Sequence, residues 1–211
     1  MLFQSYYPWL LGNLVTLIWE QRAHWLGKWQ ILPSGYLELI FSLDTKIDEI
    51  HGKRVGEHFN PTRHFCFLSG LHTKPLYLNI QRFHNIGIRF HPIAIKALFG
   101  FPCSEVTDWA IISDDFLKEM AEIEERLKAP DEFITKAKWL EQHFLKKLNE
   151  SSDLHLALKL RHVLKKSLTS IYAGNKIQMD ELTGYSRMHT HKLFSDWFGL
   201  SPGRTLRLQQ C

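Results

Sequence analysis

The chain has 211 residues, of which 45% are hydrophobic and 23% charged, and its formal net charge is +4. This composition excludes a disordered chain, a collagen-like chain and a coiled-coil rod, and the length suits one large domain or two small ones. The three cysteines, Cys66, Cys103 and Cys211, are too few and too widely spaced for a disulfide scaffold or a cysteine zinc site. They favour reduced thiols in a cytoplasmic protein.

The N-terminal segment holds the most apolar stretch of this part of the chain, from Tyr6 to Trp19. A membrane-spanning helix needs about 18 or more apolar residues, and this shorter stretch is interrupted by polar ones. No positively charged segment precedes it, so it does not read as a signal peptide. We therefore expect no contact with a membrane, and we expect Trp9, Leu10, Leu14 and Leu17 to lie in the core.

The first half of the chain, residues 1–112, is predicted to consist mainly of short strands. Apolar residues alternate with their neighbours at Leu37–Leu43, Leu76–Gln81 and Ile86–Phe90. Alternation with a period of two buries one face of a sheet and leaves the other in water. Turn residues separate these segments, which favours a small β-barrel or sandwich. Residues Pro92–Phe99 fit one helix, ended by the glycine that follows.

The pattern becomes helical from about residue 114. A helix from Asp114 to about Leu127 is followed by Ala129-Pro130-Asp131, which breaks it, and by a second helix over residues 132–148. The second helix carries one apolar stripe, formed by Phe133, Ala137, Leu140, Phe144 and Leu148. That stripe fits packing onto the sheet and a homodimer seam equally well. A polar break at residues 149–153 marks the expected domain boundary.

The sequence thus predicts an α+β protein with three parts. Residues 1–128 form a mainly β sensor or assembly domain, 129–150 a linker helix, and 151–211 an all-α module. The positive charge gathers at the C-terminal end: residues 131–211 hold 13 Lys and Arg against 8 Asp and Glu, and the remainder holds 13 against 14. A basic terminal module on a near-neutral body fits either a polyanionic partner or a solvated lysine face.

The C-terminal module is predicted to be a chain of helices. A long helix over Leu154–Tyr172 ends at Gly174, and a very short helix over Met179–Leu182 ends at Thr183-Gly184. Ser186 is placed to cap a helix that runs to Phe198, and Ser201-Pro202 starts another. Two short helices joined by a tight turn with a glycine form a helix-turn-helix.

The second helix of this pair has two distinct faces. Thr190, Leu193, Phe194 and Trp197 fall on one stripe, which should face the core of the module. The opposite surface carries Arg187, Met188, His191, Lys192 and Ser195. A helix of this shape fits the major groove of double-stranded DNA, where Arg and Lys contact phosphates or guanine. Many helical hairpins have a similar polar face, so the pattern alone leaves a non-DNA role open.

Three short motifs lie at a particular spacing: Gly184-Tyr185-Ser186, Lys192-Leu193-Phe194 and Gly199-Leu200-Ser201-Pro202. This string resembles the first helix-turn-helix of AraC/XylS-type transcription regulators. The segments Pro33–Phe41, Gly70–Pro75 and Gly87–Pro92 resemble an uncharacterised N-terminal domain found on one branch of these regulators.

The resemblance implies a cytoplasmic, sequence-specific DNA-binding regulator with an N-terminal sensor or dimerisation domain. It places base contacts on Met188, His191 and Lys192 and a backbone contact on Arg187. A small-molecule effector and a homodimer through residues 132–148 are further partners that fit it. Core positions are implied for Tyr185, Leu193, Phe194, Trp197 and Phe198.

The chain also departs from the family pattern. Thr190 stands at a buried leucine, Lys192 at an arginine, and Thr205 at a position where an aromatic residue is usual. We expect the Thr190 hydroxyl to bond back to the carbonyl of Ser186 or Arg187, and Thr190→Leu to stabilise the module by about 1 kcal/mol or more. The family's second helix-turn-helix would follow Cys211, so we expect either a fragment or half of a DNA reader. The alternative is a small-molecule-binding protein whose degenerate reader no longer binds DNA.

Other chemistry is weakly supported by the sequence. His51, His58, His64 and His72 fall in turn-rich sequence, but their spacing matches no zinc motif, and we expect no metal or other cofactor. No nucleophile motif or phosphate loop is present, so we expect no enzyme activity. Arg89 could hold an anion in a pocket or simply point outward from a strand, with the second alternative favoured. Glu38 is either a buried polar contact or part of the wet face of its strand.

Overall fold

The computed structural model describes residues 2–12, 14–23, 27–43, 46–51, 66–108, 110–111, 114–174 and 178–209. Its strands are β1 (Leu2–Tyr6), β2 (Val15–Ala23), β3 (Gly27–Ile31), β4 (Leu37–Ser42), β5 (Lys46–His51), β6 (Cys66–Ser69), β7 (Leu76–Phe90) and β8 (Ala110–Ile111). Its helices are α1 (Ile93–Phe99), the 3₁₀ helix η1 (Cys103–Val106), α2 (Asp114–Lys128), α3 (Phe133–Asn149), α4 (Leu154–Tyr172), α5 (Met179–Thr183), α6 (Arg187–Phe198) and α7 (Pro202–Leu208). An antiparallel sheet followed by helices agrees with the predicted mixture of α and β structure.

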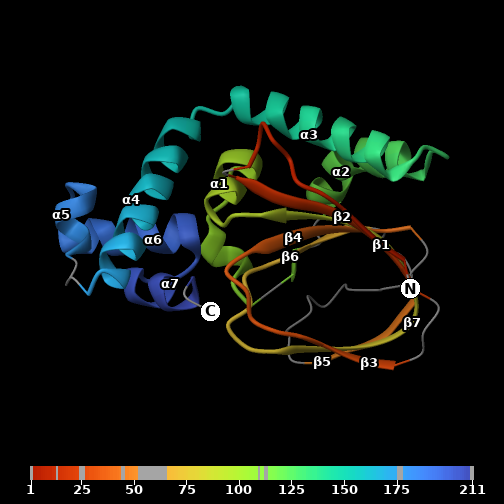
Figure 1. The fold of residues 1–211 in the computed structure, drawn as a ribbon, viewed down its shortest axis with the longest axis horizontal. Helices are drawn as coiled ribbons and strands as arrows, with labels where there is room; N and C mark the ends of the chain where they lie inside the picture. The colour runs from red at the N-terminus through yellow and green to blue at the C-terminus, as the bar shows by residue number, and fades with distance from the viewer. Residues whose placement is uncertain are drawn as a thin grey trace.

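The sheet is open, so of the two predicted alternatives, a barrel or a sandwich, the closed barrel is wrong. Its strands lie in the order β1-β2-β7-β4-β6-β8, and every pair is antiparallel. β3 and β5 pair with the first part of β7 and lie below the main layer in Figure 1. Closure would require the two outermost strands to pair, and within the described residues β1 pairs with β2 and β8 with β6. Alternation alone could not decide this, because it is the same in barrels and open sheets.

β7 is the central strand and pairs with β2, β3, β4 and β5. The sequence predicts two strands over residues 76–81 and 86–90, whereas the structure has one continuous strand of 15 residues. Its later part pairs with both β2 and β4. Gly87 lies in this part because Trp19 of β2 packs directly over it, and a Cβ there would collide with the indole ring. The glycine therefore marks a close approach within the strand and not a strand end.

One face of the sheet forms the core, with Leu37, Leu39 and Phe41 of β4 buried as predicted. Ile86, Ile88 and Phe90 of β7 are likewise inaccessible to solvent. The side chains of Leu78 and Ile80, predicted to alternate in the same way, lie outside the described part of the structure.

The N-terminal segment differs from its prediction. Leu14 and Leu17 are buried as expected, but Trp9 is 89% and Leu10 52% exposed. The cause is the buried carboxylate of Glu141 on α3, which accepts hydrogen bonds from Tyr6 Oη at 2.6 Å and from the Leu10 amide at 2.8 Å. The hydrogen bond that Tyr6 donates to Glu141 raises the pKa of Tyr6 to about 12. The two bonds hold the segment beside α3.

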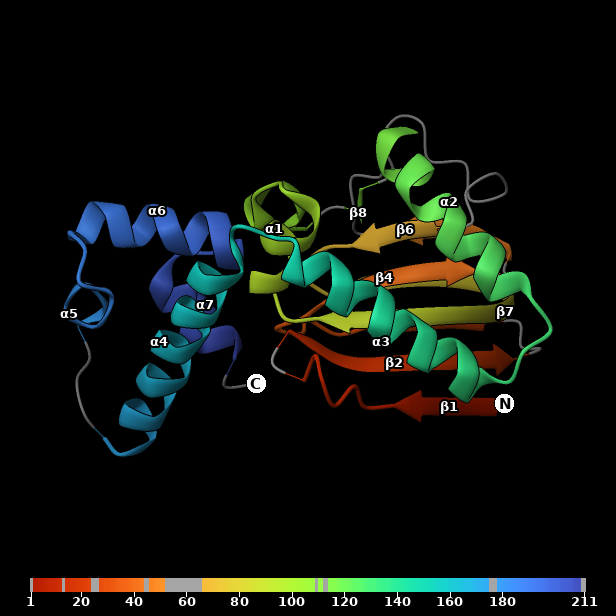
Figure 2. The same cartoon turned by 90° about the horizontal axis from the view of Figure 1, so that it is seen from above.

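Helices α2 and α3 lie across one face of the sheet (Figures 1 and 2), within a residue or two of the predicted bounds. The apolar stripe of α3, from Phe133 to Leu148, is buried inside the chain. Phe144, for example, packs edge-on against Phe90 of β7, with ring centroids 5.3 Å apart. The stripe is thus accounted for by intramolecular packing; a homodimer through the exposed residues of 132–148 stays an untested prediction.

Helices α4 to α7 form a bundle at one end of the sheet, with α1 between bundle and sheet (Figure 2). The C-terminal end of α6 packs on α1 and η1: Thr107 Oγ1 donates to the Gly199 carbonyl at 3.1 Å, and Phe198 packs edge-on against His91. Most buried apolar residues of sheet and bundle form one continuous cluster, and Leu17, Trp19 and Ile40 form a second, smaller one. None of the helices in the described residues is long and apolar enough to cross a membrane.

Candidate nucleic-acid interface

The pair of helices α5 and α6 is joined by a three-residue turn. Gly184 ends α5 in the left-handed conformation, with φ of 75°, and its amide donates to the carbonyl of Asp180. Ser186 then caps α6: its Oγ accepts a hydrogen bond from the His189 amide at 3.3 Å. Gly199, with φ of 74°, ends α6. These ends were all predicted, because each is set by capping residues next to it in the sequence.

The inner face of α6 is the predicted one. Thr190, Phe194, Trp197 and Phe198 are at most 2% exposed, and Leu193 is half-buried. The rings of Phe194 and Phe198 stack with centroids 4.7 Å apart. This packing fixes the rotation of α6 about its axis, and with it the face turned to solvent.

The outer face carries the four residues predicted to contact DNA. Arg187, Met188, His191 and Lys192 are all exposed, and Met188 reaches 84%. Arg187 and His191, four residues apart, line a cleft of about 290 Å³ between α5, α6 and the start of α7. The four side chains therefore lie together on one surface of α6.

Tyr185, predicted to be a core residue, is 39% exposed. Its ring lies 4.6 Å from that of His189, and Lys159 of α4 lies over it with Nζ 5.1 Å from the centroid. Because these contacts are on the outside of the turn, Tyr185 belongs to the surface beside α6 and not to its core.

The polar group on the inner face of α6 is Thr190, whose surroundings differ from the expectation. Its hydroxyl lies 2.8 Å from the hydroxyl of Thr183, which is also buried. The carbonyl oxygen of Tyr185 is farther away, at 3.5 Å. The predicted bonds to Ser186 or Arg187 are not the ones formed. A leucine would have to replace one half of a buried hydroxyl pair, so the predicted stabilisation by Thr190→Leu should change sign.

We expect Thr190→Val, which keeps the shape and removes the hydroxyl, to lower the free energy of unfolding by about 1 kcal/mol. In a Thr183→Val background the same change should cost about 0.5 kcal/mol or less, because no buried partner is then left behind. Urea unfolding of the parent, both single variants and the double variant measures this coupling. Additive effects of the two substitutions would contradict the hydroxyl pair.

The other predicted site candidates are Arg89 and the histidines between residues 51 and 72. Arg89 points outward and pairs with Glu38, with Nε 2.9 Å from Oε1, so this arginine is already bound to a carboxylate of the neighbouring strand. His72 is buried with Nε2 2.8 Å from Ser69 Oγ. His58, His64 and the side chain of His51 lie outside the described residues. Within the described ranges, no three His, Cys, Asp or Glu side chains are grouped so that they could hold a metal ion.

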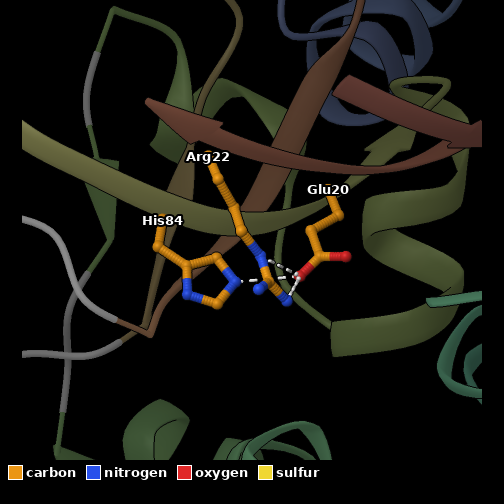
Figure 3. Close-up of polar contacts among 3 residues, drawn as sticks. All are labelled: Glu20, Arg22 and His84. Atoms are coloured by element: carbon orange, nitrogen blue, oxygen red, sulfur yellow. Dashed lines mark hydrogen bonds and ion pairs between the residues drawn. The ribbon is translucent and has the colours of Figure 1, made fainter. Parts of the chain in front are cut away.

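A polar cluster that the sequence analysis missed lies on β2 and β7 (Figure 3). The carboxylate of Glu20 is 3% exposed, and its Oε1 accepts from Arg22 Nη2 at 2.7 Å and from His84 Nε2 at 2.8 Å. Burial alone would raise the pKa of Glu20, but the hydrogen bonds from His84 and Arg22 outweigh it and hold that pKa below its usual value. The sequence offers one signal for this cluster: Glu20 follows an apolar run and lies two residues before Arg22. Residues two apart share one face of a strand.

Comparison with known families gives one match. Residues 10–111, which run from just before β2 to the end of β8, match a domain of unknown function, DUF6597. Neither the curated proteins nor the solved structures gave a match to this chain.

Proposed function

We propose that the chain is a DNA-binding transcription regulator of AraC/XylS type. In this proposal α5 and α6 form a helix-turn-helix, α6 enters the major groove, and residues 1–128 form a sensor or dimerisation domain. The matched domain of residues 10–111 is one known from AraC-like regulators, which supports the proposal for the N-terminal part. The motifs at residues 184–202 support it for the C-terminal part.

The observation that carries the proposal is the placement of Arg187, Met188, His191 and Lys192. All four are exposed on one surface of α6, opposite the buried stripe. Their end of α6 lies away from the sheet, on the outer edge of the bundle in Figure 2. The N-terminal residues of a recognition helix are the ones that reach base edges. Met188, His191 and Lys192 would contact bases, and Arg187 the phosphate backbone.

Lys192→Ala tests this assignment, with the full chain as the protein. The parent should bind double-stranded DNA with a log–log salt slope of about −0.9 for each phosphate neutralised. Removing one base or phosphate contact should weaken binding to the duplex that the parent enriches from a random pool by about 10-fold, at roughly 1–3 kcal/mol per contact. The measurement is fluorescence-anisotropy titration of labelled duplex at several salt concentrations.

Lys138→Ala is the matched control. Lys138 is an exposed lysine on α3, and the change removes the same charge from another surface. Equal affinities of the Lys192 and Lys138 variants would contradict the recognition surface. Absence of DNA binding by the parent at low salt would favour the alternative, a small-molecule-binding protein with a degenerate reader.

A further inference from the structure

A second site lies where the sheet meets the turn between α2 and α3. A cleft of about 400 Å³ opens there between the strands β2 and β7 and residues 127–131. Arg22, His84 and Lys136 line it, and Leu43, Leu127 and Pro130 give it apolar walls. Neither the DNA surface nor the matched domain gives this cleft a role.

Lys136 of α3 is the unusual member of this group. The residue is 5% exposed, and in the part of the chain that the structure describes its ammonium has no hydrogen bond or ion pair. Burial lowers the pKa of Lys136, and the negative charges of Glu20 and Asp131 raise it without outweighing the burial. A buried charge is stable only when it is paired. Because the Lys136 ammonium faces an open cleft and is unpaired there, an anion that entered the cleft would supply the missing partner.

The charged groups around Lys136 already have partners. Arg22 and His84 both bind Oε1 of Glu20 (Figure 3), so this carboxylate is satisfied by its neighbours.

At the mouth of the cleft, Asp131 is bound by Arg126, and Lys128 pairs with Glu124 at 2.6 Å and Glu125 at 3.1 Å. The charge left over inside the cleft is therefore positive and belongs to Lys136.

We infer that this cleft binds a small organic oxyanion, with a carboxylate or phosphate head and an apolar body. The head would accept hydrogen bonds from Lys136 Nζ. The body would lie against Leu43, Leu127 and Pro130, and the volume of the cleft is in the range of small-molecule sites. Glu20 holds Arg22 and His84 at fixed positions beside the head, which spares the ligand the cost of ordering them. The inference is independent of DNA binding.

The experiment uses the full chain and two probes, sodium hexanoate and inorganic phosphate, at constant ionic strength set with sodium chloride. Binding should raise the melting temperature with increasing probe concentration, since a ligand that binds only the folded state stabilises it by mass action. A shift with hexanoate but not phosphate assigns a carboxylate with an apolar body. A shift with phosphate alone assigns a phosphate head if Lys136→Met abolishes it, because phosphate also stabilises folded proteins in general by being excluded from their surface.

Lys136→Met removes the ammonium and keeps most of the length of the side chain, and it should weaken binding at least 10-fold by calorimetric titration. Lys138→Met, two residues along the same helix and exposed, should bind as the parent does. Lys136→Gln serves if the methionine variant does not fold. No melting shift of the parent with either probe, or full binding by the Lys136 variant, would overturn the inference.

Discussion

Replacing Trp197 with alanine should lower the free energy of unfolding by about 3–5 kcal/mol, the usual cost of truncating a buried aromatic side chain. Trp197 is 1% exposed, and Nζ of Lys96 on α1 lies over its ring, 5.1 Å from the centroid. Because α6 packs against α1 and η1 at this end, the cavity would open where the bundle meets the sheet. We therefore expect the whole chain to be destabilised and not the bundle alone.

Trp9→Ala is the matched control, because it deletes the same side chain at a position that is 89% exposed. It should change the stability by no more than about 0.5 kcal/mol. Urea unfolding followed by circular dichroism compares the two variants. A loss below about 1 kcal/mol for Trp197→Ala would mean that α6 is not packed as described.

Lowering the pH from 7 to 5 should destabilise the parent more than the variant His91→Phe. His91 is fully buried between Tyr36 and Phe198, and among the described residues its Nε2 has no hydrogen-bond partner. Burial lowers the pKa of His91 well below 6.5, and the positive charge of Arg161 lowers it further. Below about pH 6.5 the unfolded chain therefore binds a proton at His91, whereas His91 stays neutral in the folded chain. The contribution of neutral His91 to the free energy of unfolding is fully present above that pH. It is lost as the pH falls, by up to about 1.4 kcal/mol for each pH unit.

The measured quantity is the difference in pH dependence between parent and variant, so any cost of fitting the larger phenylalanine cancels. The lowered pKa of Glu20 acts in the same direction, but it is common to both proteins. His155→Phe makes the same substitution at an exposed position of α4 and serves as the matched control. Parallel stability curves for the parent and His91→Phe between pH 7 and 5 would show that His91 does not titrate differently in the two states.

The helical half of the fold was predictable because its signals are local. Gly184, Ser186 and Gly199 determine the ends of α5 and α6 through contacts within four residues. The apolar stripe of α6 likewise sets which face is exposed, and so it places Arg187, Met188, His191 and Lys192 on the surface. What those four residues bind is a separate question, since periodicity describes a face and not a partner.

The features that could not be predicted depend on contacts between distant residues. Trp9 is as apolar as any core residue, but hydrogen bonds from Tyr6 and from the Leu10 amide to Glu141, 135 and 131 residues away, hold its segment outside the core. Whether the sheet closes depends on the positions of its outermost strands, about which alternation along one strand carries no information. The Glu20 cluster and the cleft at Lys136 likewise join β2, β7 and α3, and none of these segments alone shows an unusual pattern.

The contacts of α6 with α1 and η1 lie at its C-terminal end, one helix length away from its first residues. Its C-terminal end is held by Thr107 at Gly199, where no larger residue would fit because a Cβ would meet the Thr107 hydroxyl. A helix of 12 residues is about 18 Å long, so a tilt of about 10° at the fixed end moves the other end by about 3 Å. That is about the length of a hydrogen bond. A change in packing at α1 and η1 that tilted α6 by this angle would therefore move Arg187 and Met188, at the other end of the helix, by about 3 Å.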